Sequence, residues 1–494
     1  MNPVSKPPAR QSPRWQGTTN TLERIALAAL LAYFICKGVY FASSIHSAIF
    51  PDEISWFGIS ELFSKSLLPP TDSSDSYQYG LITHTPILYF CVMGRLLHLN
   101  FLPLSDLIFL RCMNICLAVL TIWYCWKLAK LLNMSAMAGL LAIAMLTNTM
   151  MFTFMAAAVN YDNLTNLFAV LSLYHLIIFL QQRHPHHFLL ASGALLFGCL
   201  TKYTLIPYAM LLILMTLYHE RKNLARIPAA PATIFSSKRK LNLVLTMLCL
   251  LALAANLKLY LGNWLEFHRL IPEINQVLAP DQAMRFRLFA RGHIVERFRR
   301  GEISLQEAQG MVFEHVHHEG DRVDALRLLQ RAASEKVQRA PRLDRFRYAF
   351  MWTDVMAQRV YGVAAHRLMP KIGYELIPYY LIIVIAAAMM IRTIHLTDLD
   401  GMAKYLIFIV AGYVLILMQV QNYKSYESSG APGLAASGRY LFPVIVPAYI
   451  LLSHYLLNST RTWWGMGVGL ATAAFFIYGE FPWFLQRVSR EWLF

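Results

Sequence analysis

Two adjacent carboxylates, Asp52 and Glu53, follow the first long apolar run of the chain. A carboxylate at the mouth of a membrane helix loses hydration energy unless it meets water, a cation or a substrate. The pair is therefore the first candidate for catalysis, because a carboxylate can accept the proton of an attacking hydroxyl or amine. Helix capping is an alternative interpretation, since negative charge after Pro51 also favours a helix N-terminus. The two interpretations are compatible.

The composition is typical of a helical membrane protein. The 494 residues are 57% hydrophobic and 15% charged, and the mean hydropathy is +0.43. Apolar runs of about 17 to 23 residues recur, and a helix of that length spans a bilayer core. We therefore predict an all-α polytopic membrane fold with about eleven transmembrane helices. The spans are expected at 24–45, 107–130, 134–155, 164–181, 187–200, 203–218, 241–261, 372–392, 403–420, 440–457 and 462–480.

The charge and the cysteines exclude other classes of protein. The net charge of +16 needs no nucleic-acid partner, because Lys and Arg gather in the cytoplasmic loops and at the lipid headgroups of membrane proteins. We therefore expect contact with membrane lipids and none with nucleic acid. The seven cysteines lie in apolar runs, which predicts buried thiols rather than disulfides or a thiolate metal site.

Loop charges predict the topology and the domains. We expect a basic cytoplasmic tail at 1–23 and an N-terminal transmembrane core at 24–261, whose first helix is retained rather than cleaved as a signal peptide. Its first outer loop, 46–106, is expected to hold two juxtamembrane helices. The polar segment 262–371 predicts an outer helical insertion, and 372–494 supplies the C-terminal transmembrane helices. The strongest inside signal is the basic stretch between His219 and Lys240.

This topology brings further polar candidates to the outer face. They are His84, Asp162, Lys202, Arg439 and Tyr440, together with the arginines of the segment 262–371. A basic residue there could hold a lipid phosphate while a carboxylate accepts a proton. Structural alternatives stay open: Lys202 could snorkel to the headgroups, Asp162 could cap a helix, and Arg439 with Tyr440 could anchor the membrane interface.

Several motifs occur in a characteristic order along the chain. They are Asp52-Glu53, His84-Thr85-Pro86, Arg111-Cys112-Met113-Asn114, Leu200-Thr201-Lys202-Tyr203 and Ser437-Gly438-Arg439-Tyr440. In this order and with this sidedness, the chain resembles the GT-C glycosyltransferases, which include the protein mannosyltransferases and the aminoarabinose transferase of lipid A. The resemblance covers most of 24–220 and returns at 437–457.

The resemblance implies a polyprenyl-phosphate-sugar donor and an inverting transfer in one displacement. Asp52 would be the general base, with Glu53 as second choice or helper. Lys202 and Arg439 would be phosphate ligands, and Asp162 would orient the acceptor or the donor. The expected location is the bacterial inner membrane, with a cytoplasmic N-terminus and an active site on the periplasmic face.

The acceptor stays open among a lipid, a glycan and a protein, because the paired prolines common after the family's histidine are replaced by Thr85-Pro86. No cofactor is implied with certainty, and a role for a divalent metal stays open. His315 and Glu319 are four residues apart, but a solvated helix surface explains them better than a metal site.

A transporter or lipid flippase is the principal alternative function. It would require charges near the bilayer midplane and interrupted spans in symmetric halves. The charged candidates lie instead at one face, which favours an enzyme. A membrane acyltransferase or phosphotransferase would require a His-centred constellation, and only His84 and His98 lie near the first outer loop.

Overall fold

The computed structural model describes residues 16–221, 239–317, 319–337, 343–364, 368–393, 400–430, 433, 435–458 and 462–494. Among these residues the only sheet is an antiparallel pair, β1 (Val363–Ala364) and β2 (Leu368–Met369), and nearly all the rest is helical. The predicted all-α class is therefore confirmed. Residues 1–15 of the basic tail and 222–238 of the basic loop lie outside the described residues.

Eight helical stretches among the described residues are long and apolar enough to cross a membrane. They fall on α1 (Gln16–Ser44), α4 (Asp106–Leu131), α7 (Asp162–Gln182), α11 with α12 (Arg239–Asn256 and Gly262–Phe267), α19 (Ile377–Thr393), α20 with α21 (Asp400–Ile416 and Tyr423–Ser429), α22 (Phe442–Asn458) and α23 with α24 (Thr462–Tyr478 and Phe481–Arg487). The chain is therefore a polytopic integral membrane protein.

The remaining three predicted spans are shorter or bent. α5 (Ala136–Thr147) and α6 (Met150–Ala156) meet at 66°, so they count as a ninth span only if the bent pair is taken as one. The spans predicted at 187–200 and 203–218 correspond to α8 (Pro185–Thr201) and α9 (Ile206–Glu220), which have 17 and 15 residues. The count of eleven spans stays a prediction.

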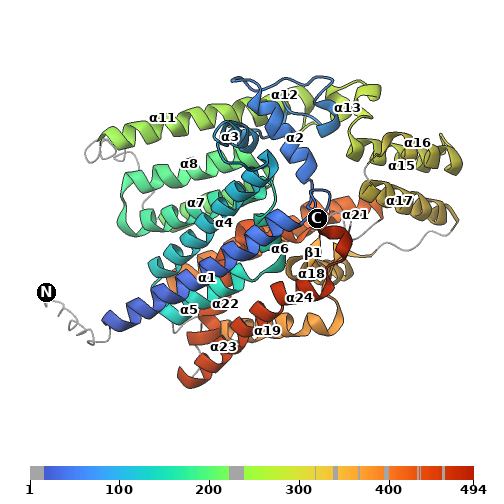
Figure 1. Ribbon diagram of the computed structural model, residues 1–494. Coiled ribbons are helices and arrows are strands. Elements are labelled where there is room, and N and C mark those ends of the chain that lie inside the picture. The colour runs from blue at the N-terminus through green and yellow to red at the C-terminus, as the bar shows by residue number, and fades with distance from the viewer. Residues whose placement is uncertain are drawn as a thin grey trace.

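The long helices lie side by side in a bundle whose two ends differ (Figure 1). The first turns of α1 lie at one end, and α15 (Arg287–Arg300), α16 (Leu305–His315) and α17 (Glu319–Val337) lie at the other. Within the bundle, α5 packs against α1 and α22. Ala138 and Ala142 of α5 are fully buried, and such small residues let membrane helices approach closely.

The loop 46–106, predicted to be the first outer loop, contains two short helices, α2 (Glu53–Ser64) and α3 (Leu88–Leu97), with the turn η1 (Tyr77–Tyr79) between them. Their contact depends on a glycine, because a Cβ at Gly94 would lie 2.7 Å from the carbonyl oxygen of Ser60. This packing holds the start of α2, and with it Asp52, at the end of the bundle.

The segment 262–371 continues after α12 with α13 (Ile274–Val277), α14 (Pro280–Ala283), α15, α16, α17 and α18 (Arg345–Tyr361). We call α15, α16 and α17 the outer helices. They enclose an apolar core of their own that includes Ile294, Val312 and Leu329. α18 instead buries Tyr348 and Trp352 in the core of the bundle. The domain limits proposed from the sequence stay a prediction.

A buried ion pair connects the first membrane helix to the last ones. Lys37 of α1 is 1% exposed, and its Nζ lies 2.5 Å from Oε2 of Glu480, between α23 and α24. The same ammonium donates to the carbonyl of Thr147 at 2.9 Å and to Oδ1 of Asn148 at 3.0 Å. These contacts satisfy all three ammonium protons inside the bundle.

We expect Lys37→Met to destabilise the protein strongly, because it leaves the Glu480 carboxylate buried without a cation. Breaking one partner of a buried pair costs about 3–5 kcal/mol. Lys37→Met combined with Glu480→Gln should regain much of this loss. Thermal unfolding in lipid nanodiscs measures the effect, and Lys258→Met, at an exposed lysine, is the control. Equal unfolding temperatures for Lys37→Met and the control would contradict the assigned role.

Candidate active site

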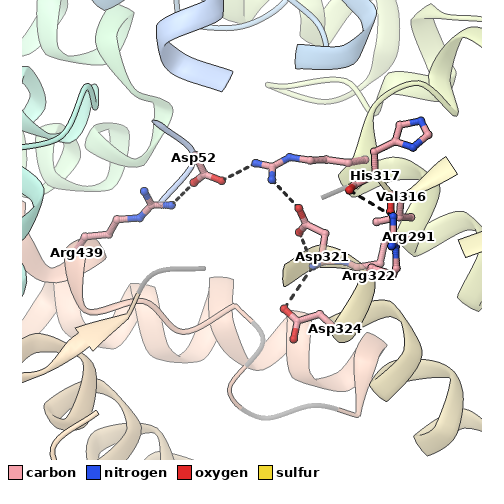
Figure 2. A network of polar contacts seen from close by, with 9 residues as sticks. Asp52, Arg291, Val316, His317, Asp321, Arg322, Asp324 and Arg439 are labelled. Atoms are coloured by element: carbon pink, nitrogen blue, oxygen red, sulfur yellow. Dashed lines mark hydrogen bonds and ion pairs between the residues drawn. The ribbon is translucent and has the colours of Figure 1, made fainter. Parts of the chain in front are cut away.

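Asp52 lies immediately before α2 in the left-handed backbone conformation, with φ of 58°. A residue other than glycine in this conformation is strained, and such strain is concentrated at functional sites. Its side chain makes no capping bond to α2. The carboxylate instead accepts from Nη2 of Arg439 at 2.6 Å and from Nη2 of Arg287 at 3.3 Å. Figure 2 shows Asp52 and Arg439 pointing toward each other.

Glu53, the neighbouring carboxylate, lies in a different environment. It is fully buried, and Arg111 donates to both of its oxygens, from Nε at 3.0 Å and from Nη2 at 2.5 Å. The amide of Val159 donates to Oε1 at 2.8 Å. Burial raises the pKa of Glu53, and Arg111 and the amide oppose that rise. Glu53 therefore shares no described contact with the partners of Asp52.

Lys202 and Asp162 form a second buried pair beside Arg439. Lys202 follows α8 in an extended conformation, is 4% exposed and donates through Nζ to Oδ1 of Asp162. Burial lowers the pKa of Lys202, while Asp162 opposes this. The ammonium also lies 4.6 Å from the ring centre of Tyr161 and 4.9 Å from that of Tyr440. Lys202 is therefore enclosed by protein.

Arg439 lies between the two carboxylates and has unused hydrogen-bonding groups. Its side chain is 8% exposed, and Nε lies 3.7 Å from Oδ2 of Asp162. Among the described residues, its buried Nε and Nη1 have no hydrogen-bond partner, and neither has Oδ2 of Asp162. Each unmade bond of this kind costs about 1–3 kcal/mol. Guanidinium donors that are buried and unpaired fit the oxygens of a phosphate.

The backbone before Arg439 is held by α18. Arg359 of α18 donates through Nη1 to the carbonyls of Gly433, at 2.7 Å, and Ala436. At Gly438, an added Cβ would lie 2.4 Å from the carbonyl oxygen of Arg359, so the two backbones are too close for a side chain. This contact positions the turn η7 (Gly438–Leu441), from which Arg439 reaches Asp52.

His84 connects the first outer loop to α12 instead. Its Nδ1 lies 3.0 Å from Oδ1 of Asn263, and Nδ2 of Asn263 donates to the His84 carbonyl at 3.0 Å. The imidazole also meets the edge of Phe267. The structure thus brings Asp52, Asp162, Lys202, Arg439 and Tyr440 together, while the described contacts of Glu53 and His84 lie elsewhere.

Three contributors to the site were not singled out from the sequence. Arg287 is one of many arginines in its segment, and no spacing distinguishes it. Arg359 is likewise one of many arginines in that segment and has no distinguishing spacing. Arg111 appeared only as part of a motif, although a charge inside an apolar run is by itself a signal of function or pairing.

The carboxylates do not fit a divalent metal. Asp52 is engaged by two arginines, and Asp162 is paired with Lys202. No group of three or more His, Cys, Asp or Glu side chains in the described part of the chain is arranged to hold a metal ion. A cation would have to displace these arginine and lysine groups, so we derive no step through a metal.

Comparison with known families gives one match to a family model. Residues 105–236 match the model described as dolichyl-phosphate-mannose-protein mannosyltransferase. Over this segment the chain resembles the protein mannosyltransferases. The match confirms the resemblance expected from the motifs, and it includes Asp162 and Lys202. No curated protein matches the chain.

Several solved structures resemble the chain at low sequence identity. The oligosaccharyltransferase of Archaeoglobus fulgidus has 12% identity and a TM-score of 0.47, covering 91% of this chain and 52% of its own. ArnT of Cupriavidus metallidurans has 13% identity and a TM-score of 0.36, and the match covers 92% of this chain and 76% of ArnT. Arabinosyltransferase EmbB of Mycobacterium smegmatis has 13% identity and a TM-score of 0.35, and the match covers 99% of this chain and 43% of EmbB. The chain spans about half the length of the archaeal chain.

We expect Glu53→Gln to lower stability much more than Asp52→Asn. The first change leaves the Arg111 guanidinium buried beside a neutral amide, which costs about 3–5 kcal/mol. The second leaves the Arg439 guanidinium beside Asp162, at 3.7 Å, and changes a side chain that is 22% exposed, so its effect on stability should be smaller. Thermal unfolding in nanodiscs measures both, and similar unfolding temperatures would contradict the different roles given to the two residues.

Gly438→Ala tests the close contact between η7 and α18. The methyl group must push the two backbones apart, which should cost about 1–3 kcal/mol and move Arg439 away from Asp52. Gly467→Ala in α23 is the matched control, because an added Cβ there meets nothing within 4 Å. Unfolding temperature is the measurement, and an unchanged value for Gly438→Ala would contradict the assignment.

Proposed function

We propose that this protein is a glycosyltransferase that moves a sugar from a polyprenyl-phosphate carrier to an acceptor at the outer face of the membrane. Arg439 carries the proposal: its buried guanidinium binds the carboxylate of Asp52 through Nη2, while Nε and Nη1 stay without hydrogen-bond partners among the described residues. This arrangement combines a candidate base with a phosphate-binding group. The match of residues 105–236 to the mannosyltransferase model supports the donor class.

The donor phosphate would bind to Arg439 and Lys202. Both cations are nearly enclosed, so their attraction for a phosphate is stronger than in water. Asp162 holds Lys202 in place, and the ring of Tyr440 lies beside both cations. As the bond between the sugar and the phosphate breaks, negative charge grows on the phosphate, and these fixed cations stabilise it.

Asp52 would act as the general base. A carboxylate held by two arginines is a weak base, so Asp52 has to lose part of this contact before it can accept a proton. The phosphate oxygens compete for the N–H groups of Arg439 and thereby free Oδ2. The acceptor's O–H or N–H proton then passes to Oδ2 while the acceptor atom forms a bond to the sugar carbon. The polyprenyl phosphate leaves with the bonding electrons, and a single displacement inverts the configuration.

The neighbouring residues have supporting roles in this scheme. Glu53, through its two bonds from Arg111, fixes the start of α2 and hence the position of Asp52. We therefore assign Glu53 a positioning role and not the helper role expected from the sequence. The substrate-binding role of His84 stays a prediction, because its described side-chain contacts are with Asn263 and Phe267 of α12.

We place the site on the periplasmic face of a bacterial inner membrane, with the N-terminus in the cytoplasm. The first turns of α1 and the outer helices lie at opposite ends of the bundle, as this orientation requires (Figure 1). The acceptor would be a lipid, a glycan or a protein that approaches beside the outer helices. A transporter or flippase is the alternative. Its support is the Lys37–Glu480 pair inside the bundle, and that pair is fully enclosed.

We expect purified protein in nanodiscs to transfer label from one member of a panel of radiolabelled polyprenyl-phosphate sugars to a membrane extract. Asp52→Asn should lower kcat by about a thousandfold, since it keeps the side-chain size but removes the base, while donor binding survives. Arg439→Gln should weaken donor binding at least about tenfold. Asp75→Asn, at an exposed carboxylate of the same outer loop, is the control and should match wild type.

Two results would contradict the proposal. One is full transfer activity in Asp52→Asn. The other is consumption of no donor by the wild type, together with movement of a labelled lipid or solute across liposomes that contain the protein. The second result would favour the transporter alternative, and the charged cluster would then be a transport gate.

A further inference from the structure

Arg287 links the outer helices to Asp52. It is the first residue of α15, 235 positions away from Asp52 in the sequence. Its Nη2 lies 3.3 Å from Oδ1 of Asp52, and its Nη1 donates to Oδ2 of Asp321 at 2.6 Å. Oδ2 of Asp52 is occupied by Arg439, so each of its carboxylate oxygens meets a different arginine.

Asp321 holds Arg287 from behind. It lies in the first turn of α17, its side chain is 7% exposed, and its Oδ1 accepts from Arg291 at 3.3 Å. Alternating charges therefore run from Arg439 through Asp52, Arg287 and Asp321 to Arg291, as Figure 2 shows for the labelled members. The outer helices pack around their own apolar core, so this row of charged side chains connects two separately packed parts of the protein.

We propose that Arg287 is a positioning residue of the transferase site, and that Asp321 keeps it in place. By holding Oδ1 of Asp52, Arg287 sets the plane of the carboxylate and leaves Oδ2 to face Arg439 and then the acceptor. The outer helices are then part of the catalytic machinery. This inference rests on the proposed function.

The arrangement answers a physical difficulty in that function. A donor phosphate draws Arg439 away from Asp52, and a carboxylate that loses one of its arginines rotates more easily about its side-chain bond. A displacement of about 1 Å in a catalytic group can cost a hundredfold in rate. Arg287 keeps one oxygen fixed throughout, because its other nitrogen is bound to Asp321.

Arg287 also influences when Asp52 is charged. Among the described groups around Asp52 are the cations of Arg439 and Arg287, with Lys202 and Tyr161 near enough to interact electrostatically and Asp162 beside Arg439. Removal of one adjacent cation makes protonation of the carboxylate easier. The acidic limb of the pH profile should therefore move to higher pH when Arg287 is neutralised.

The test compares Arg287→Gln and Arg287→Lys with wild type in the transfer assay. For Arg287→Gln we expect kcat to fall about ten- to a hundredfold with little change in the donor KM, and the acidic limb of kcat/KM to rise by about one pH unit. Arg287→Lys should restore much of both. Arg300→Gln is the matched control, because Arg300 lies on the same helix with its side chain 64% exposed. An unchanged profile and kcat in Arg287→Gln would overturn the inference.

A double-mutant cycle tests the role of Asp321. If Asp321 acts through Arg287, Asp321→Asn should lower kcat in the wild type but have little further effect in Arg287→Gln. If the two substitutions instead lower kcat by independent factors that multiply in the double variant, Asp321 only supports the fold of the outer helices. That result would overturn its assigned role.

Hydrogen exchange provides a readout that needs no turnover. Without substrate, Asp52→Asn and Arg287→Gln should both speed amide exchange in α15 and α17, and Arg300→Gln should not. Faster exchange in a protein that transfers no sugar would support the Asp52–Arg287 link while overturning the proposed function. Sugar transfer with unchanged exchange and an unchanged pH profile in Arg287→Gln would overturn only the inference.

Discussion

The guanidinium of Arg111 joins three segments on which the site depends. Through Nη1 it donates to the carbonyls of Ala42, at 2.6 Å, and Ile45, at 3.0 Å, where α1 ends. Through Nε and Nη2 it binds Glu53, whose Oε1 also accepts the amide of Val159 shortly before α7. A charge buried in a membrane protein has to be compensated in this way. The same bonds hold the segments that carry Asp52 and Asp162 close together.

The neighbouring charges obey the same constraint, with one exception. Lys202 is paired with Asp162, and Asp52 is paired with Arg439 and Arg287. Arg439 lies between two carboxylates and still keeps donors without partners among the described residues. Two unused cationic donors on one buried guanidinium, beside the carboxylates of Asp52 and Asp162, are where an anionic ligand would fit. The unused groups of Arg439 are cationic donors, whereas the Lys37 ammonium has an acceptor for each of its three protons, and this distinguishes the candidate site from the Lys37–Glu480 pair.

The membrane helices and the one-sided placement of the charged candidates could be predicted because both depend on local signals. Hydropathy over about 20 residues and loop charge need no knowledge of the fold. The gathering of Asp162, Lys202 and Arg439 followed from counting spans. The helix lengths were less accessible: α8 and α9 have 17 and 15 residues, and α5 meets α6 at 66°. A break of this kind is tolerated where the backbone is buried in protein, as it is in α5 and α6, and hydropathy does not report it.

The amino-acid sequence by itself determined the helical membrane class, the resemblance to the mannosyltransferases and most of the candidate residues, since these follow from composition and local motifs. Only the tertiary structure decided that Asp52 and Glu53 have different partners. Both side chains are carboxylates at adjacent positions. However, Asp52 pairs with Arg439, 387 residues away in the sequence, and Glu53 pairs with Arg111, 58 residues away. The contribution of Arg287 is likewise a long-range contact. Such contacts arise from how separate helices pack, and no local pattern in the sequence encodes that packing.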